Sequence, residues 1–366
     1  MIGQLPSHKN YYLKRFFHRP VVPHHIIFDI TEHCNLKCAH CADRTFQTTE
    51  SELSTSEVCA CFDSLLSLGK ERLPYIALNG GEPFLKKGLD EVISFLEGHS
   101  FPWGIITNGT CEAPAVMQKI TSSRHLRMFR VSLDGLEKNH NALRGSPDCF
   151  EKTIAFIKQT RESNLKIRLV FTVTALNIDD ILPTARLAAR LGCHEIHFSL
   201  IAFSRSPEKL AHETELQNLF QKKERNCRIS LKNERLLTPD TSKLWNALNH
   251  AKKIRSIKVI VTPDLSASKL SDYFSSQGIR RNDKCVFPWF GMRIDAAGNV
   301  YPCRSINIIL GNVRTTPLID LFNGTAFEEF RSRFDGQTLS ICQRCSYRNG
   351  RLNWRTLLTR LRDGYH

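Results

Sequence analysis

The chain has 366 residues, of which 41% are hydrophobic, and a formal net charge of +15. This composition supports a sizeable core and excludes a globally disordered chain. No apolar run reaches the length of a membrane span and the N-terminus lacks an apolar signal core, so we expect a cytoplasmic protein without a transmembrane segment.

Short apolar strands alternate with helical stretches from His25 onward, after a basic, aromatic-rich lead-in at 1–24. A capping box of Ser54 and Glu57 opens the first helical stretch. The alternation favours a parallel sheet with right-handed crossovers. It predicts an α/β fold, a partial (β/α)6 TIM-like barrel, over 25–203. The expected strands are 25–31, 75–79, 103–107, 126–133, 166–174 and 195–201, and the expected helices lie near 55–69, 88–98, 112–122, 149–163 and 179–191.

Three further segments follow the predicted barrel. Residues 204–284 are polar and mostly helical in pattern, so we expect a helical connecting region. Residues 285–350 combine short strands and turns with four cysteines and predict a small metal-stabilised module, because so short a segment buries little core by itself. The tail at 351–366 is basic and amphipathic, and we expect it to dock on the barrel.

Thirteen cysteines in a chain without a secretion signal favour metal binding or catalysis over disulfides. Cys34, Cys38 and Cys41 form a C-x3-C-x2-C loop directly after the first strand. An iron–sulfur cubane usually takes four cysteines, so three leave one iron open for chemistry. The alternative is a zinc site completed by His33 or His40.

Polar and glycine-rich motifs follow the next three strands. Gly80-Gly81-Glu82-Pro83 ends the second strand, Thr107-Asn108-Gly109 ends the third, and Ser132 to Gly135 ends the fourth, with Arg144 shortly after. Barrel enzymes bind their ligands at the carboxyl ends of the strands. We therefore expect all three motifs to face one cleft.

The cysteine spacing and the Gly80–Pro83 motif together resemble radical S-adenosylmethionine enzymes. The resemblance implies a [4Fe-4S] cluster on the three cysteines, with S-adenosylmethionine bound at the open iron. Reductive cleavage of S-adenosylmethionine then yields a 5′-deoxyadenosyl radical, which abstracts hydrogen from the substrate. An electron donor such as flavodoxin or ferredoxin is implied as a partner. His40 stands where the family often has an aromatic residue, which is a mild departure.

The same resemblance implies roles for individual residues in the cleft. The backbone at Gly80 and Gly81, with Glu82, would receive the methionine amino group. Arg144 would pair with the methionine carboxylate through charge-assisted hydrogen bonds. Ser132 and Asp134 would contact the ribose or the substrate. The full predicted cofactor-binding set is Gly80, Gly81, Glu82, Pro83, Thr107, Asn108, Ser132, Asp134 and Arg144.

The four C-terminal cysteines, Cys285, Cys303, Cys342 and Cys345, supply enough ligands for one closed site. The segment around them resembles the SPASM and twitch extensions of the same superfamily, which implies one auxiliary [4Fe-4S] cluster; a zinc ribbon is the alternative. Some peptide-oxidising relatives have an acidic base immediately after the second of these cysteines, where this chain has Arg304. Arg304 is therefore predicted to bind a substrate phosphate or carboxylate.

Arg304 and Asp134 are the predicted catalytic residues, and Asp295 or Asp134 is the candidate proton acceptor of an oxidation. The leading prediction is oxidation, epimerisation or elimination of a small metabolite such as a sugar, aminocyclitol or nucleoside. A second is modification of a ribosomally made peptide. The 24 residues before the first strand are too few for a leader-binding or cobalamin domain, so this reading needs a separate recognition protein. A third is a zinc-stabilised nucleic-acid-binding protein, which the basic charge permits but the strand-end motifs disfavour.

Overall fold

The computed structural model describes residues 22–41, 51–163, 165–221, 233–275, 285–335 and 339–345. The predicted lead-in, apart from residues 22–24, and the predicted amphipathic tail lie outside these ranges. Among the described residues, no helix has both the length and the apolar composition needed to cross a bilayer.

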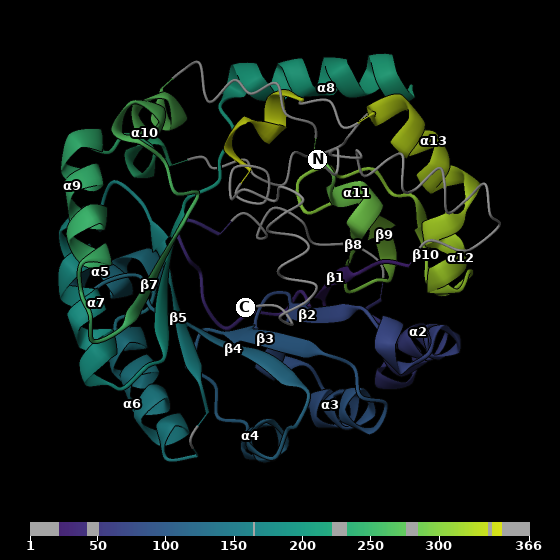
Figure 1. Ribbon diagram of the computed structural model, residues 1–366, viewed down its shortest axis with the longest axis horizontal. Helices are drawn as coiled ribbons and strands as arrows, with labels where there is room; N and C mark the ends of the chain where they lie inside the picture. Colours follow the sequence, from purple (N-terminus) through teal and green to yellow (C-terminus); the bar gives the residue numbers. More distant parts are fainter. Residues whose placement is uncertain are drawn as a thin grey trace, which may run out of the picture.

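One curved sheet of ten strands forms the frame of the molecule, in the order β10-β9-β8-β1-β2-β3-β4-β5-β6-β7 (Figure 1). Neighbouring strands from β8 through β1 to β7 run parallel. The six predicted strands are all present, which confirms the expected α/β partial barrel. They are β1 (His25–Asp29), β2 (Tyr75–Asn79), β3 (Trp103–Thr107), β4 (Leu126–Ser132), β5 (Ile167–Val173) and β6 (Glu195–Leu200).

Helices cover the outer face of this sheet (Figure 1). The capping box is formed: Ser54 Oγ accepts from the Glu57 amide, and Glu57 Oε2 accepts from the Ser54 amide at 2.7 Å. Helix α5 was not expected, because its sequence EKNHNALR is short and contains few apolar residues. The covering helices are α2 (Thr55–Asp63), α3 (Leu89–Gly98), α4 (Pro114–Thr121), α5 (Glu137–Arg144), α6 (Cys149–Arg161), α7 (Ile181–Arg190) and α9 (Thr241–Lys252). Short 3₁₀ turns lie at Leu66–Leu68, Lys70–Arg72, Pro83–Leu85, Ile178–Asp180, Glu234–Leu236 and Ser340–Arg344.

The two faces of the barrel strands carry different chemistry, because successive side chains of a strand point to opposite faces. Ile26 and Phe28 of β1, with Ile76 and Leu78 of β2, belong to the main buried core under the helices. The alternate positions point inward and include polar residues that line a cleft: Asp29, Asn79, Arg130, Ser132, Thr172 and Ser199. The barrel interior is therefore a chamber in which polar and charged side chains lie among apolar ones.

The region 204–284 departs from its predicted helical character. Helices α8 (Ser206–Phe220), α9 and α10 (Ala267–Phe274) are present, but Lys258–Thr262 forms β7, which pairs in parallel with β6. Its sequence KVIVT is rich in β-branched residues, as strands are. Because polar segments flank this short run on both sides, the strand was not recognised in the sequence.

The C-terminal module begins with α11 (Phe287–Phe290), β8 (Gly291–Ile294) and β9 (Asn299–Tyr301). It continues with β10 (Gly311–Asn312), α12 (Leu318–Asn323) and α13 (Thr325–Phe334). Strand β8 pairs in parallel with β1, whereas β9 turns back antiparallel to it. The module thus extends the barrel's own sheet, and its residues reach the barrel interior.

Candidate active site

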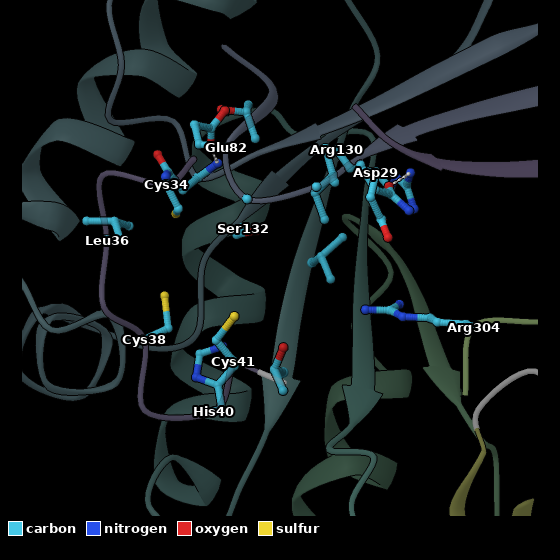
Figure 2. Close-up of a pocket in the computed structure, with 18 of the residues that line it drawn as sticks. Asp29, Cys34, Leu36, Cys38, His40, Cys41, Glu82, Arg130, Ser132 and Arg304 are labelled. Atoms are coloured by element: carbon cyan, nitrogen blue, oxygen red, sulfur yellow. Dashed lines mark hydrogen bonds between the residues drawn. The ribbon is translucent and has the colours of Figure 1, made fainter. Parts of the chain in front are cut away.

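A cleft of about 630 Å³ opens inside the barrel, at the carboxyl ends of the strands. Figure 2 shows Cys34, Cys38 and Cys41 on one side and Arg304 pointing in from the other. Most of the predicted site residues line this cleft, but Pro83 and Asp134 are not among the lining residues. The predicted residues that do line it are Cys34, Cys38, Cys41, Gly80, Gly81, Glu82, Thr107, Asn108, Ser132, Arg144, Asp295, Arg304 and Cys345.

The two glycines hold the start of the cysteine loop. The Gly81 amide donates to Thr31 O at 2.8 Å, and the Glu82 amide donates to His33 O at 2.7 Å. A Cβ on Gly80 would lie 2.4 Å from Thr31 O, and one on Gly81 would lie 2.2 Å from His33 O. Only glycine permits so close an approach. These amides are therefore engaged with the cysteine loop itself, and the expected reception of the methionine amino group by this backbone and Glu82 stays a prediction.

The carboxylate of Glu82 is held by the end of the third strand. Thr107 Oγ1 donates to Oε1 and the Asn108 amide donates to Oε2, both at 2.7 Å, and the Phe84 amide donates to Oε1 at 3.2 Å. Burial dominates and raises the pKa of Glu82 despite these bonds. In this geometry Glu82 ties the second and third strand ends together.

Three further hydrogen bonds fix the middle of the cysteine loop. The side-chain Nδ2 of Asn108 donates to Asn35 Oδ1 at 2.9 Å, and Asn35 Nδ2 donates to Thr110 Oγ1 at 2.8 Å. At the end of α5, Leu143 O accepts from the Ala39 amide at 2.7 Å. The segments after β2 and β3 and the end of α5 therefore hold the loop through protein hydrogen bonds.

Asp134 lies fully buried beneath this loop. Its Oδ2 is 2.7 Å from Arg144 Nη2 and 3.3 Å from His40 Nε2, and its Oδ1 accepts from the Thr172 amide at 2.7 Å. Burial opposes ionisation of Asp134, but the charge of Arg144 together with His40, His140 and the Thr172 amide outweighs it and lowers the pKa of Asp134. Burial also lowers the pKa of His40 to about 4. The structure places Asp134 behind Arg144, so it positions that arginine and does not face the cleft as predicted.

The thiols of the cysteine loop fit an iron–sulfur cluster. Burial raises the pKa of Cys34 and of Cys38, so each thiol needs a metal or a cation to become a thiolate. Arg144 Nη1 supplies a cation 3.9 Å from Cys38 Sγ. Within the described residues no three metal-ligating side chains converge on one ion. This spacing is compatible with a [4Fe-4S] cubane, because each thiolate binds a different iron of the cluster and the three need not meet at one ion.

The four C-terminal cysteines line a second, smaller hollow of about 30 Å³. Burial raises the pKa of Cys303 and of Cys342, and the Ile306 amide donates to Cys303 Sγ at 3.3 Å. Cys345 and Arg304 line both this hollow and the main cleft. Four thiols around one enclosed space fit a fully ligated cluster adjoining the cleft.

The sequence analysis missed two charged residues of the inner chamber. Arg130 stands within the β4 sequence LRMFRVS, and Arg293 within the β8 sequence GMRI. Both line the cleft. The signal was a charged side chain inside an apolar strand, which indicates a strand with one polar face.

A partial β/α barrel with a three-cysteine loop after its first strand defines an iron–sulfur enzyme whose cluster faces a substrate cleft. Two family models match the chain: "Radical SAM superfamily" at residues 28–188 and the SPASM "Iron-sulfur cluster-binding domain" at residues 285–346. The chain belongs to the radical SAM superfamily and carries a C-terminal SPASM domain. Its cofactors are a [4Fe-4S] cluster, S-adenosylmethionine and auxiliary iron–sulfur in the SPASM domain.

Among curated proteins, the AdoMet-dependent heme synthase of Methanosarcina barkeri is 26% identical over 334 residues, covering 89% of each chain. The Fe-coproporphyrin III synthase of the same organism is 31% identical and covers 57% of this chain and 50% of its own. Mycofactocin maturase MftC of Mycolicibacterium smegmatis is 30% identical over 46% of this chain and 42% of its own. Streptococcus suis SuiB bound to S-adenosylmethionine shares the fold, with a TM-score of 0.64, 14% identity and coverage of 93% and 76%.

Proposed function

We propose that this enzyme abstracts hydrogen from a carboxylate-bearing small molecule, and that an iron tetrapyrrole is its substrate. The observation that carries the proposal is the alignment with a heme synthase over 89% of both chains, barrel and SPASM domain included. The Fe-coproporphyrin III synthase match favours the same substrate class. The sugars, aminocyclitols and nucleosides first expected as substrates stay untested predictions, and the proposal differs from them because of these two alignments.

The cleft supports an anionic substrate. Its volume of about 630 Å³ lies in the range of small-molecule and cofactor sites. Arg304 points into it opposite the cysteine loop (Figure 2), and an arginine binds a carboxylate through two parallel N–H bonds. When bound, the cluster and S-adenosylmethionine supply a 5′-deoxyadenosyl radical. Arg304 would then orient the substrate toward the loop, and Arg144 would hold the carboxylate of S-adenosylmethionine.

A peptide substrate is the second candidate. It is supported by the similarity to mycofactocin maturase, although that similarity covers 46% of this chain. One solved SuiB structure holds the precursor peptide SuiA, but at 14% identity this likeness concerns the fold alone. The match to mycofactocin maturase covers less of this chain than the match to the heme synthase does, so a tetrapyrrole is favoured over a peptide as the substrate.

The test is hydrogen transfer from a labelled substrate. The reconstituted, reduced enzyme is given S-adenosylmethionine and iron coproporphyrin III deuterated in its propionate side chains. We expect deuterium in the 5′-deoxyadenosine and a porphyrin of new mass. Unlabelled 5′-deoxyadenosine, formed at the same rate without porphyrin, would reject the tetrapyrrole. Transfer from a deuterated peptide instead would establish the second candidate.

A further inference from the structure

Two arginines stand on the floor of the cleft, at inward-facing positions of β4 and β8. We propose that Arg130 and Arg293 form a binding subsite for a carboxylate of the substrate, distinct from Arg304 on the wall. This inference rests on the proposed function, because it names the group by which that substrate is held. It also assigns a role to two residues outside the cysteine, glycine and strand-end motifs.

Arg293 is almost completely buried, at 3% exposure, yet it lines the cleft. Its Nε donates to Asp29 Oδ2 at 2.7 Å, and its guanidinium lies 4.4 Å from the centre of the Tyr301 ring. Within the described part of the chain, Nη1 is buried and has no hydrogen-bond partner. A buried N–H without an acceptor loses its bond to water and gains none in return, which is unfavourable. An acceptor on a bound ligand would remove that penalty.

Arg130, on the same floor of the cleft, also has a buried N–H group without a hydrogen-bond partner among the described residues. Its Nη2 donates to the amide oxygen of Asn79 at 3.2 Å, while Nε is buried without a partner among the residues described. The ion pairs of the described residues give Arg130 no carboxylate. Among the described residues, the hydrogen-bond partner of its side chain is therefore a neutral amide and not a carboxylate.

The two arginines belong to one layer of the barrel. Asp29, the partner of Arg293, lies directly across from Asn79, the partner of Arg130, in the pairing of β1 with β2. Figure 2 shows Arg130 and Asp29 together at the inner end of the pocket. The chain Arg293–Asp29–Asn79–Arg130 thus places two guanidinium groups on one floor.

The carboxylates already present on this floor are engaged with the protein. Asp29 accepts from Arg293, and Asp295 Oδ2 accepts from the Tyr301 hydroxyl at 2.7 Å. With Arg304 included, three arginines face two aspartates, which leaves the chamber positive. A ligand with carboxylates on more than one edge, as coproporphyrin has, can engage the floor and the Arg304 wall at once.

The experiment compares binding of iron coproporphyrin III with binding of its tetramethyl ester, using the reconstituted holoenzyme. Arg130→Gln should weaken binding of the acid about 10- to 100-fold, as expected for loss of a hydrogen bond between charged groups, and should change ester binding less than about 2-fold. The matched control is Arg127→Gln, an exposed residue of the same strand, which should bind both as the wild type does. Unchanged binding of the acid by Arg130→Gln would overturn the subsite.

Arg293→Lys gives a second variant that keeps the charge opposite Asp29 but removes the planar fork. Its thermal midpoint and iron content verify the fold, and it should also bind the acid more weakly than the wild type does.

If the wild type binds neither porphyrin, the tetrapyrrole proposal fails, and [1-¹³C]propionate is used as the probe instead. Broadening of its carboxyl resonance by the wild type but not by Arg130→Gln would support the subsite, and equal line widths would reject it.

Discussion

At the scale of single residues, the catalytic loop owes its shape to hydrogen bonds from neighbouring strand ends. Gly80 and Gly81 bring the backbone of the second strand end against residues 31–33, closer than any side chain would allow. Glu82 then ties this segment to the third strand end. The arrangement prepares three thiols for a cluster at little entropic cost.

Gly80→Ala should therefore displace the cysteine loop. The new Cβ would lie 2.4 Å from a backbone oxygen, and Gly80 has φ of +134°, which an alanine tolerates poorly. We expect loss of the catalytic cluster, measured as a fall of about four irons per chain. Gly98→Ala is the control, because a Cβ at the end of α3 meets nothing within 4 Å. Full iron content in the Gly80 variant would show that the loop adapts.

Asp134→Asn should lower stability through Arg144. The substitution leaves a buried guanidinium without its charged partner, which costs about 3–5 kcal/mol for a buried pair. Chemical unfolding of the apo and reconstituted forms measures the loss. Lys152→Gln removes an exposed partner from the Asp148 pair and should change stability far less, because solvent and salt screen an exposed ion pair. Equal effects of the two variants would reject the positioning role.

At the scale of secondary structure, the C-terminal C-x2-C segment is held by helices of the connecting region. The guanidinium of Arg344, between Cys342 and Cys345, pairs with Glu208 of α8 and donates to the Tyr273 carbonyl of α10 at 2.6 Å. It also stacks over Phe203. The connecting region therefore holds the segment that carries Cys342 and Cys345 in place.

Glu208→Gln should weaken the hold of α8 on the Cys342–Cys345 segment by removing the charged partner of Arg344. With the buried charge of Arg344 uncompensated, we expect the auxiliary cluster to become labile and the iron content to fall toward about four per chain. Glu213→Gln, at an exposed position of the same helix, should keep the full content. Iron analysis and the electron paramagnetic resonance of the reduced auxiliary cluster distinguish the two. An unaltered auxiliary signal in Glu208→Gln would contradict the prediction.

Local patterns made the barrel predictable. The six strands are runs of apolar residues, and the cysteine ligands lie within eight residues of one another, so both could be read along the chain. Strand β7 was missed because it is a five-residue run between polar segments, and helix α5 because it contains few apolar residues. Arg130 and Arg293 were missed because their meeting depends on pairings between β1, β2 and β8, which are far apart in sequence. The inward direction of a strand side chain follows from register, which the sequence alone does not fix.

At the scale of the whole molecule, the two cysteine groups adjoin one cleft through Arg304 and Cys345. Anaerobic reconstitution should give about eight irons in the wild type, four for each cluster. Replacing Cys34, Cys38 and Cys41 together by alanine should leave about four and abolish cleavage of S-adenosylmethionine. Acid-labile sulfide, counted in parallel, separates iron–sulfur from adventitious iron. Four irons in the wild type and none in the variant would mean that the C-terminal cysteines hold zinc or remain metal-free.

The parallel pairing of β8 with β1 also bears on how the enzyme is made. At about 5–20 residues per second, a ribosome needs on the order of 10–50 s to reach β8 after it has completed β1. Throughout that time one edge of β1, with its buried sequence HIIFD, has no partner strand. An unpaired apolar edge invites aggregation. Slower induction, lower temperature and added chaperones should therefore raise the soluble yield, and metal is best supplied once the full chain has been released.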